Sequence, residues 1–427
     1  MNLLRQLGNF WRLWVTTIVL ACSSNVFAQT SYRVTDLGGG GGENEACAMS
    51  VNDEGWTEIM AWNGDPAQDV NFIVATLLSG RALIDVDGFK LDLGTLGGKN
   101  SWMNWGEINN FGQIVGLSET AVPDPNGEDI CGFGTHLTCR PFLWQFSHMS
   151  ALPTLGGNNG EASAINNRGQ IVGMAEDGTV DSSCPPDTTN NRIQLPVLWE
   201  NGRAHALPTA GHDPDGFALW INDHGHAVGT SGTCGGATSH AVLWENDTVS
   251  PLPDLGAGAI AYGINNRGQI VGSVYFSPGG ATRYAALWQN GVLTNLGTLP
   301  GDLSAIATGI NEQGQVVGST WDSHFNWSRA FIYQHGKMTD LNTLFPDSSN
   351  LFATMANKIN ERGQISGMAK VLSGPDEGKL HAFLATPVNE RIGRSVADVA
   401  RTPAGSNLPA NVGKQLLQRF GVGQFGR

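Results

Sequence analysis

The chain has 427 residues, of which 15% are charged, and its formal net charge at pH 7 is −14. This acidic balance makes nucleic acids and anionic membrane surfaces poor partners. No apolar run in the sequence approaches the length that spans a bilayer, so we expect no transmembrane segment.

The first 28 residues have the layout of a secretory signal. Arg5 and Arg12 precede a short apolar run at Leu13–Cys22, and the segment ends in the small residue Ala28. This layout predicts cleavage after Ala28 and export to the periplasm, the cell surface or the medium. An alternative interpretation treats Val19–Cys22 as a lipobox, which would place a lipid anchor on Cys22.

One nine-residue phrase recurs through the rest of the chain. It reads INNRGQIVG at Ile165–Gly173 and again, without change, at Ile264–Gly272. Five further copies diverge to different degrees and lie at Val51–Ile59, Ile108–Gly116, Ile221–Gly229, Ile310–Gly318 and Ile359–Gly367. All seven copies keep the first Asn and the Gly that follows it three residues later.

The phrase predicts a β-hairpin. An apolar residue and Asn end one strand, and Gln followed by Ile or Val begins the next. Gly169 and its equivalents supply the positive φ that a short hairpin loop needs, and the side chain of Asn166 can hydrogen-bond amides two residues on. A calcium-binding loop is the alternative, but such a loop needs several carboxylates and INNRG has none.

The intervals between the copies also repeat. The first Asn recurs at spacings of 43 to 57 residues, which is the period of a propeller or solenoid. Each interval holds a strand such as Val197–Trp199, a tight turn such as Glu200–Gly202, and a strand that ends like Leu296–Leu299. Four short strands repeated seven times predict an all-β, seven-bladed β-propeller over residues 29–387.

The two ends of the repeat region complement each other. Tyr32–Gly38 matches the fourth strand of a repeat, whereas the last repeat stops after its third strand at His381–Leu384. We therefore expect the N-terminal strand to complete the last blade and close the ring. Residues 388–427 are basic and contain scattered Pro and Gly, which predicts a mostly disordered tail.

The repeats resemble the extracellular HAF repeat family, whose units combine a GINNxGQxVG hairpin, an HAFxW strand and a DLGTLGG strand. The hairpin is kept in six units, with a vestige in the first, and the name-giving triplet is complete only at His381–Phe383. The resemblance covers Tyr32–Pro387. It implies an exported location and a repeat fold, and it brings no established activity.

Five cysteines follow the predicted signal. Cys131 and Cys139 lie eight positions apart in one loop, and we predict a disulfide between them because an exported chain can oxidise its thiols. Cys184 and Cys234 lie in equivalent loops of consecutive repeats, so a second pairing is consistent with the sequence. Cys47 lies in a predicted inner strand and is expected to be a buried free thiol.

The turns after the first and third strands of each repeat are short and uniform, whereas the loops after the second and fourth strands vary. Both variable loops of a four-stranded blade emerge on one face of the disc, and variable loops on a rigid scaffold are where binding usually lies. We therefore expect the site on this variable-loop face. The candidate ligand-binding residues are Trp102, Trp105, Glu161, His212, Asp213, Asp215, Phe217 and Trp321.

Trp105 leads this set because the other six repeats have Ala at its position. It is interpreted either as a stacking platform beside the central channel or as a plug of the channel end. Trp102, Glu161 and Phe217 begin neighbouring inner strands and are expected to converge with it, because inner strands meet at the axis. His212 with Asp213 and Asp215 offers a metal-binding or acid/base set, with a solvated loop as the alternative.

No nucleophile elbow, zincin helix, phosphate loop or CxxC motif is present, and we expect no cofactor. The sequence therefore favours a binding or interaction scaffold. Its ligand is unknown, and a carbohydrate or another envelope protein fits equally. A glycan-cleaving lyase or hydrolase is the alternative, which rests on analogy between propellers, and a structural envelope protein is a third hypothesis.

Overall fold

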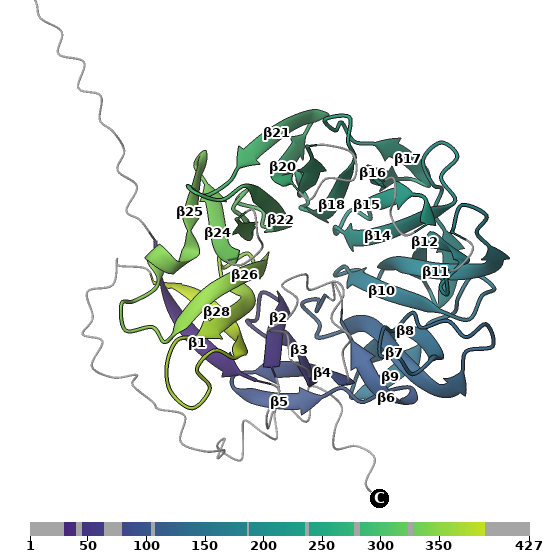
Figure 1. The fold of residues 1–427 in the computed structure, drawn as a ribbon, viewed down its shortest axis with the longest axis horizontal. Coiled ribbons are helices and arrows are strands. Elements are labelled where there is room, and N and C mark those ends of the chain that lie inside the picture. Colours follow the sequence, from purple (N-terminus) through teal and green to yellow (C-terminus); the bar gives the residue numbers. More distant parts are fainter. Residues whose placement is uncertain are drawn as a thin grey trace, which may run out of the picture.

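The structure, a computed structural model, describes residues 30–39, 45–63, 79–103, 107–185, 188–234, 239–276, 282–322 and 328–388. The predicted signal, residues 389–427 of the predicted tail and Trp105 lie outside these residues, whereas Val388, which the sequence analysis places in the tail, ends the last strand of the chain. Seven four-stranded antiparallel sheets surround a central axis (Figure 1). This arrangement confirms the predicted seven-bladed β-propeller.

Blades 1 to 6 follow the chain from β2–β5 to β22–β25, and blade 7 consists of β26, β27, β28 and β1. The innermost strands of blades 1 to 7 are β2 (Glu45–Val51), β6 (Gly97–Trp102), β10 (Gly160–Ile165), β14 (Asp215–Ile221), β18 (Ala259–Ile264), β22 (Ser304–Ile310) and β26 (Leu351–Ile359). The second strands are β3 (Thr57–Asn63), β7 (Ile114–Pro123), β11 (Ile171–Val180), β15 (Ala227–Gly232), β19 (Ile270–Tyr275), β23 (Val316–Trp321) and β27 (Ile365–Val371).

The two outer strands of each blade complete the sheets. The third strands are β4 (Ser79–Val86), β8 (Leu137–Gln145), β12 (Arg192–Glu200), β16 (Ser239–Glu245), β20 (Arg283–Gln289), β24 (Ser328–Gln334) and β28 (Leu380–Val388). The outermost strands are β5 (Phe89–Asp92), β9 (His148–Ala151), β13 (Arg203–Ala206), β17 (Thr248–Pro251), β21 (Val292–Gly297), β25 (Lys337–Asp340) and β1 (Ser31–Gly38). A 3₁₀ turn, η3 (Leu341–Leu344), follows β25, and no helix in the described ranges is long and apolar enough to cross a membrane.

The N-terminal strand closes the ring, as predicted. β1 runs antiparallel to β28, with Ser31 opposite Val388 and Asp36 opposite Phe383. Asp36 also lies 3.0 Å from the ring nitrogen Nδ1 of His381, so the histidine of the HAF triplet pairs with the aspartate of the closing strand. The outer edge of β28 is therefore paired, and β1 is the outermost strand of blade 7.

The phrase forms the hairpin between the first and second strands of each blade. The side-chain oxygen of Asn166 accepts hydrogen bonds from the backbone N–H groups of Arg168 and Gln170, both at 3.0 Å, and Gly169 has a φ of 77°. The Asn166 Nδ2 group donates to the backbone carbonyl of Asn222 in the next blade at 2.9 Å. The same bond joins every blade to the next, so seven Asn side chains form a closed ring of inter-blade hydrogen bonds.

A β-bulge lies at the end of six inner strands, immediately before the phrase, and the equivalent residues of blade 2 are outside the described ranges. In blade 3 the extra residue falls between Ala162 and Ala164. The last glycine of the phrase faces this irregular stretch. A Cβ atom on Gly173 would lie 2.0 Å from the Glu161 carbonyl oxygen, which explains why six of the seven phrases end in Gly, whereas the first ends in Ile59.

Buried tryptophans of the third strands join successive blades. Trp199 is 1% exposed, and its ring N–H donates to the Pro153 carbonyl of the preceding blade at 2.7 Å. Trp244 and Trp288 make the equivalent bonds to the carbonyls of Pro208 and Pro253. The Trp-bearing strand seen in the repeats therefore serves packing between blades.

The predicted disulfide is present, and so is the second pairing that the sequence left open. Cys131 pairs with Cys139 across eight residues, and Cys184 pairs with Cys234 across 50 residues. The second bond ties the loops of blades 3 and 4 together. Cys47 is buried and free, as expected.

Candidate functional site

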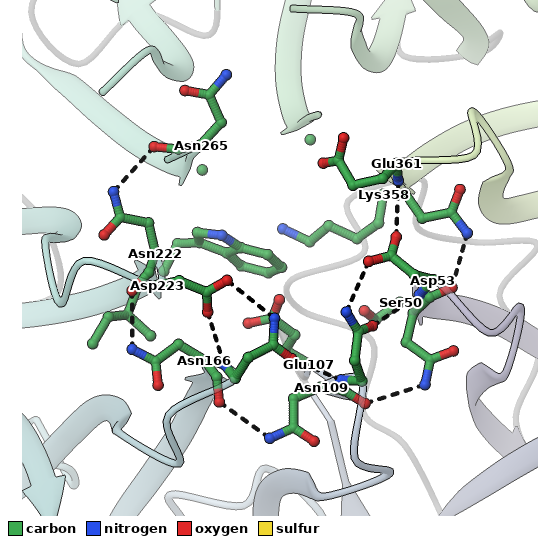
Figure 2. A pocket seen from close by; sticks show the side chains of 18 of the residues that line it. Ser50, Asp53, Glu107, Asn109, Asn166, Asn222, Asp223, Asn265, Lys358 and Glu361 are labelled. Carbon is green, nitrogen blue, oxygen red and sulfur yellow. Dashed lines mark hydrogen bonds between the residues drawn. The ribbon is translucent and has the colours of Figure 1, made fainter. Parts of the chain in front are cut away.

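A cavity of about 160 Å³ lies on the axis at the hairpin-turn end of the channel. Residues of the phrase, or residues next to it, line this cavity in all seven blades (Figure 2). We call this end the hairpin mouth. It is the face opposite the variable loops, since the first turn of a blade and its second loop lie at opposite ends of the second strand.

The third residue of each phrase forms the rim of the hairpin mouth. The rim residues are Asp53, Asn110, Asn167, Asp223, Asn266, Glu312 and Glu361. The side-chain oxygen of each accepts the backbone N–H of its equivalent in the preceding blade, at 2.6 to 3.0 Å, and the last bond returns from Glu361 to Asp53. Four of these seven residues are carboxylates, so the rim is acidic.

The residue immediately before each phrase occupies the next level inward, the floor. In blades 1 to 7 the floor residues are Ser50, Glu107, Ala164, Trp220, Gly263, Gly309 and Lys358. The floor position follows directly on the β-bulge, and bulges re-aim side chains at the ends of strands. Of the seven, all but Ala164 line the cavity.

Lys358 is the central feature of the floor. Its side chain extends from β26 into the middle of the rim (Figure 2) and is 7% exposed. The Nζ atom donates to the Thr308 carbonyl at 3.1 Å and lies 3.3 Å from the centroid of the Trp220 ring. Burial lowers the pKa of Lys358 to about 7, against the opposing effect of the carboxylates of Glu107 and Glu58.

Glu58 and Glu107 are the acidic partners of Lys358. Glu58 is 0% exposed and pairs with the floor residue Ser50 across the hairpin, so both side chains lie on one face of the sheet. Burial raises the pKa of Glu58 and that of Glu107 well above the usual range, and Lys358 counteracts both shifts. Within the described ranges, neither carboxylate oxygen of Glu58 nor Oε2 of Glu107 has a hydrogen-bond partner.

The structure distributes the residues predicted from sequence over four blades. Trp102 is 9% exposed and packs against Trp62 and Phe133, with ring centroids 6.4 and 5.9 Å away, in the core shared by blades 1 and 2. Glu161 is 5% exposed and lies in β10, and Phe217 is half-buried in β14. Trp105 is outside the described residues, so its proposed convergence with these residues stays a prediction.

The segment around His212 does not form one cluster. His212 is exposed, while Asp213 accepts a hydrogen bond from the Ser231 hydroxyl at 2.8 Å and lies 3.0 Å from the His240 ring. Asp215 instead accepts the backbone N–H of Gln194, and burial raises its pKa to about 7. The carboxylates of Asp213 and Asp215 therefore accept hydrogen bonds from different strands, β15 and β12.

Trp321 ends β23 in blade 6 and is 9% exposed, with the Arg283 guanidinium 5.8 Å from its ring centroid. The described acid, Cys and His residues include one group close enough to hold a metal ion, namely Asp181 with Cys184 and Cys234. The disulfide between the two cysteines removes their thiolates as ligands.

Sequence reasoning missed Glu58, Glu107, Trp220 and Lys358. The sequence signal that could have found them is that each differs from the residues that most other repeats have at the same position. Glu58 stands where the other blades have Val115, Val172, Val228, Val271, Val317 and Ser366. Glu107, Trp220 and Lys358 stand at the floor position, which is Gly, Ala or Ser in the other four repeats. The comparison that singled out Trp105, applied at these two positions, finds all four.

No family model and no curated protein matches this chain. Solved structures do, and they share its fold at low identity. An acylaminoacyl peptidase from Pyrococcus horikoshii superposes with a TM-score of 0.50 at 9% identity, over 80% of this chain and 51% of the peptidase. This chain therefore spans about half the length of that protein.

Two further structures are less similar. TolB from Acinetobacter baumannii superposes with a TM-score of 0.38 at 14% identity, over 72% of this chain and 60% of TolB. A gluconolactonase from Xanthomonas campestris gives a TM-score of 0.32 at 11% identity, over 58% of this chain and 79% of the enzyme.

Proposed function

We propose that this chain is an exported β-propeller of the HAF repeat type that binds a small, positively charged organic ligand at the hairpin mouth. One observation carries the proposal. Glu58, Glu107 and Lys358 come from blades 1, 2 and 7, and each replaces a residue that the repeat keeps small or apolar. Glu107 and Lys358 line one cavity, and Glu58 interacts electrostatically with Lys358. Buried charges are costly to a fold, so their convergence favours a function.

The charge balance favours a cation. Four carboxylates of the rim stand above the floor, in which Lys358 is the one basic residue. A cavity with walls of one sign concentrates ligands of the opposite sign. Trp220 adds an aromatic face, which attracts ammonium groups, and Lys358 already occupies that face. A ligand ammonium would compete with Lys358 for the same acidic and aromatic surroundings.

Export is supported by the signal-like N-terminus and by two disulfides, which form in oxidising compartments. The resemblance to HAF repeats points the same way. A site on the variable-loop face, for a saccharide or a protein, remains a separate hypothesis because its leading residue, Trp105, lies outside the described ranges.

The glycan-cleaving alternative has one candidate acid. Asp215 combines a raised pKa with a hydrogen bond to the side chain of Asp181. Two carboxylates that share a hydrogen bond are closer than the separation of about 5 Å or more that retaining and inverting glycosidases use. This pair therefore does not favour glycoside hydrolysis.

Isothermal titration calorimetry tests the proposal directly. The wild-type protein is titrated with choline, ethanolamine, glucose and acetate at low salt. We expect the two cations to bind, acetate not to bind, and the affinity for cations to fall as NaCl rises from about 20 to about 500 mM.

Asp223→Asn is the matched variant, because three other blades already have Asn at this rim position. It should weaken cation binding without loss of stability, whereas Glu377→Gln, which removes an exposed charge from a loop of blade 7, should leave binding unchanged. Equal binding of acetate and choline, or no effect of Asp223→Asn, would contradict the proposal.

A further inference from the structure

We propose that the Lys358 amine is a nucleophile that forms an imine with a small aldehyde or ketone entering the hairpin mouth. The inference rests on the proposed function in one respect: the acidic rim would hold a cationic group of the same molecule while its carbonyl reaches Lys358. The chemical class of the substrate is therefore a small cationic carbonyl compound.

The geometry around Nζ orients the amine. A neutral amine has two N–H groups and one lone pair. The Thr308 carbonyl accepts one N–H at 3.1 Å, and the face of the Trp220 ring, 3.3 Å away at its centroid, accepts the other as a weak π acceptor. The remaining tetrahedral position of the nitrogen holds the lone pair. Because Lys358 lines the cavity, this lone pair has space in which a carbonyl carbon can approach it.

The surroundings also supply neutral amine near neutral pH. Burial lowers the pKa of Lys358 to about 7, whereas an ordinary lysine holds far below 1% of neutral amine at that pH. The charged groups that face Lys358 are Glu107 and Glu58, with the rim carboxylates above them. A desolvated lysine with a lowered pKa is the usual form of an amine that attacks carbonyl groups.

Glu107 is placed to move the protons of this reaction. The Lys358 nitrogen attacks the carbonyl carbon, a C–N bond forms, and a proton passes from nitrogen to the carbonyl oxygen to give a carbinolamine. The carboxylic acid of Glu107 then protonates the hydroxyl, which leaves as water as the C=N bond forms. The resulting iminium returns a proton to Glu107. Burial raises the pKa of Glu107 well above its usual range, which favours the acid form that donates this proton.

Reductive trapping tests the inference on the wild-type protein. The protein is incubated separately with betaine aldehyde, glycolaldehyde or glyoxylate, reduced with cyanoborohydride, digested and analysed by mass spectrometry. We expect Lys358 to be modified near neutral pH roughly tenfold faster than the exposed Lys337 and Lys370, because burial lowers the pKa of Lys358 and so supplies neutral amine there. The cationic aldehyde should react faster than the neutral one, and the anionic aldehyde slowest.

Variants separate chemistry from binding. Glu107→Gln should slow trapping at Lys358 and should leave the modification of Lys337 unchanged, while Lys358→Met should abolish only the modification at position 358. The comparison between lysines within the wild-type protein needs no variant to fold. If Lys358 reacts no faster than the exposed lysines while choline still binds, the inference is wrong and the proposed function stands. If choline does not bind either, both fail.

Discussion

At the scale of single residues, the first Asn of the phrase has two structural tasks. Its side-chain oxygen accepts the hydrogen bonds that hold the hairpin turn, and its side-chain NH₂ group donates a hydrogen bond to the next blade. The sequence predicts the first task, because Asn is a common turn residue and its side chain bonds to backbone amides of the same turn. The second task depends on where the next blade lies, which no single repeat specifies.

Asn166→Ala should therefore destabilise the fold more than an ordinary turn substitution. Four hydrogen bonds of the buried Asn166 side chain are lost, which should lower the free energy of unfolding by about 2–3 kcal/mol. Denaturation in guanidinium chloride measures the change. Arg168→Ala, an exposed change in the same turn, is the control and should have little effect. Equal stability of the two variants would show that the ring of Asn bonds contributes nothing.

Glu58→Val restores the residue of five other blades and should stabilise the fold at alkaline pH. The pKa of Glu58 is raised in the folded state, so the folded state binds more protons and stability falls as pH rises above the ordinary glutamate pKa of 4.5. The variant removes this penalty. Its advantage should grow from near zero at about pH 5 to about 1–3 kcal/mol at about pH 8.

Thermal melting of wild type and Glu58→Val across this range measures the difference. An advantage that does not change with pH would show that packing, and not the charge, accounts for it. A variant that is less stable at both pH values would show that Glu58 stabilises the fold as part of an ion pair.

At the scale of elements, the β-hairpins, the blade strands and the closing strand follow from local and repeated patterns, and the structure confirms them. The hairpin-mouth site does not follow in the same way. The short uniform turns suggested a plain face, but their side chains differ from blade to blade at the floor and rim positions. In the six blades where the structure describes it, the bulge before the phrase orients the floor residue. Strict alternation of side chains between the two faces of a strand does not predict that orientation.

Deleting Gln29–Gly38 should leave β28 without its partner strand and expose the core that Tyr32 covers. We expect aggregation or a melting temperature far below that of the wild type, because an open sheet edge with apolar surface recruits other chains. Size-exclusion chromatography and thermal melting measure this. Thr35→Ala, an exposed change within β1, should leave both unchanged. A deletion variant that remains monomeric with wild-type melting would contradict the closure.

The two disulfides should differ in their contribution to stability because they close loops of different length. By the loop-entropy model, replacing Cys184 and Cys234 with Ala should cost about 4 kcal/mol, and replacing Cys131 and Cys139 with Ala about 2.5 kcal/mol. Guanidinium denaturation of the two double variants tests the order. The reverse order would mean that local packing outweighs the entropy of the unfolded chain.

At the scale of the whole molecule, seven nearly identical hairpins converge on one axis and build a cavity that no repeat contains by itself. Two closed rings of hydrogen bonds hold the hairpins together. One runs through the first Asn of each phrase, and the other runs through the rim residue that follows it. This backbone is uniform, so individual repeats can change a floor residue without changing the fold. Glu107, Trp220 and Lys358 are such changes, and they give the symmetric ring an asymmetric, charged centre.

The most direct test of the hairpin-mouth site compares the floor residue Trp220 with Trp105, the residue predicted to lead a site on the variable-loop face. Trp220→Ala introduces the residue that blade 3 has at the floor position, and Trp105→Ala introduces the residue that the other repeats have at the position of Trp105. Calorimetry with choline, scaled to the fraction of folded protein, should show that Trp220→Ala weakens binding by about tenfold or more and that Trp105→Ala leaves it unchanged. Lost binding in Trp105→Ala together with wild-type binding in Trp220→Ala would place the site on the variable-loop face and contradict this account.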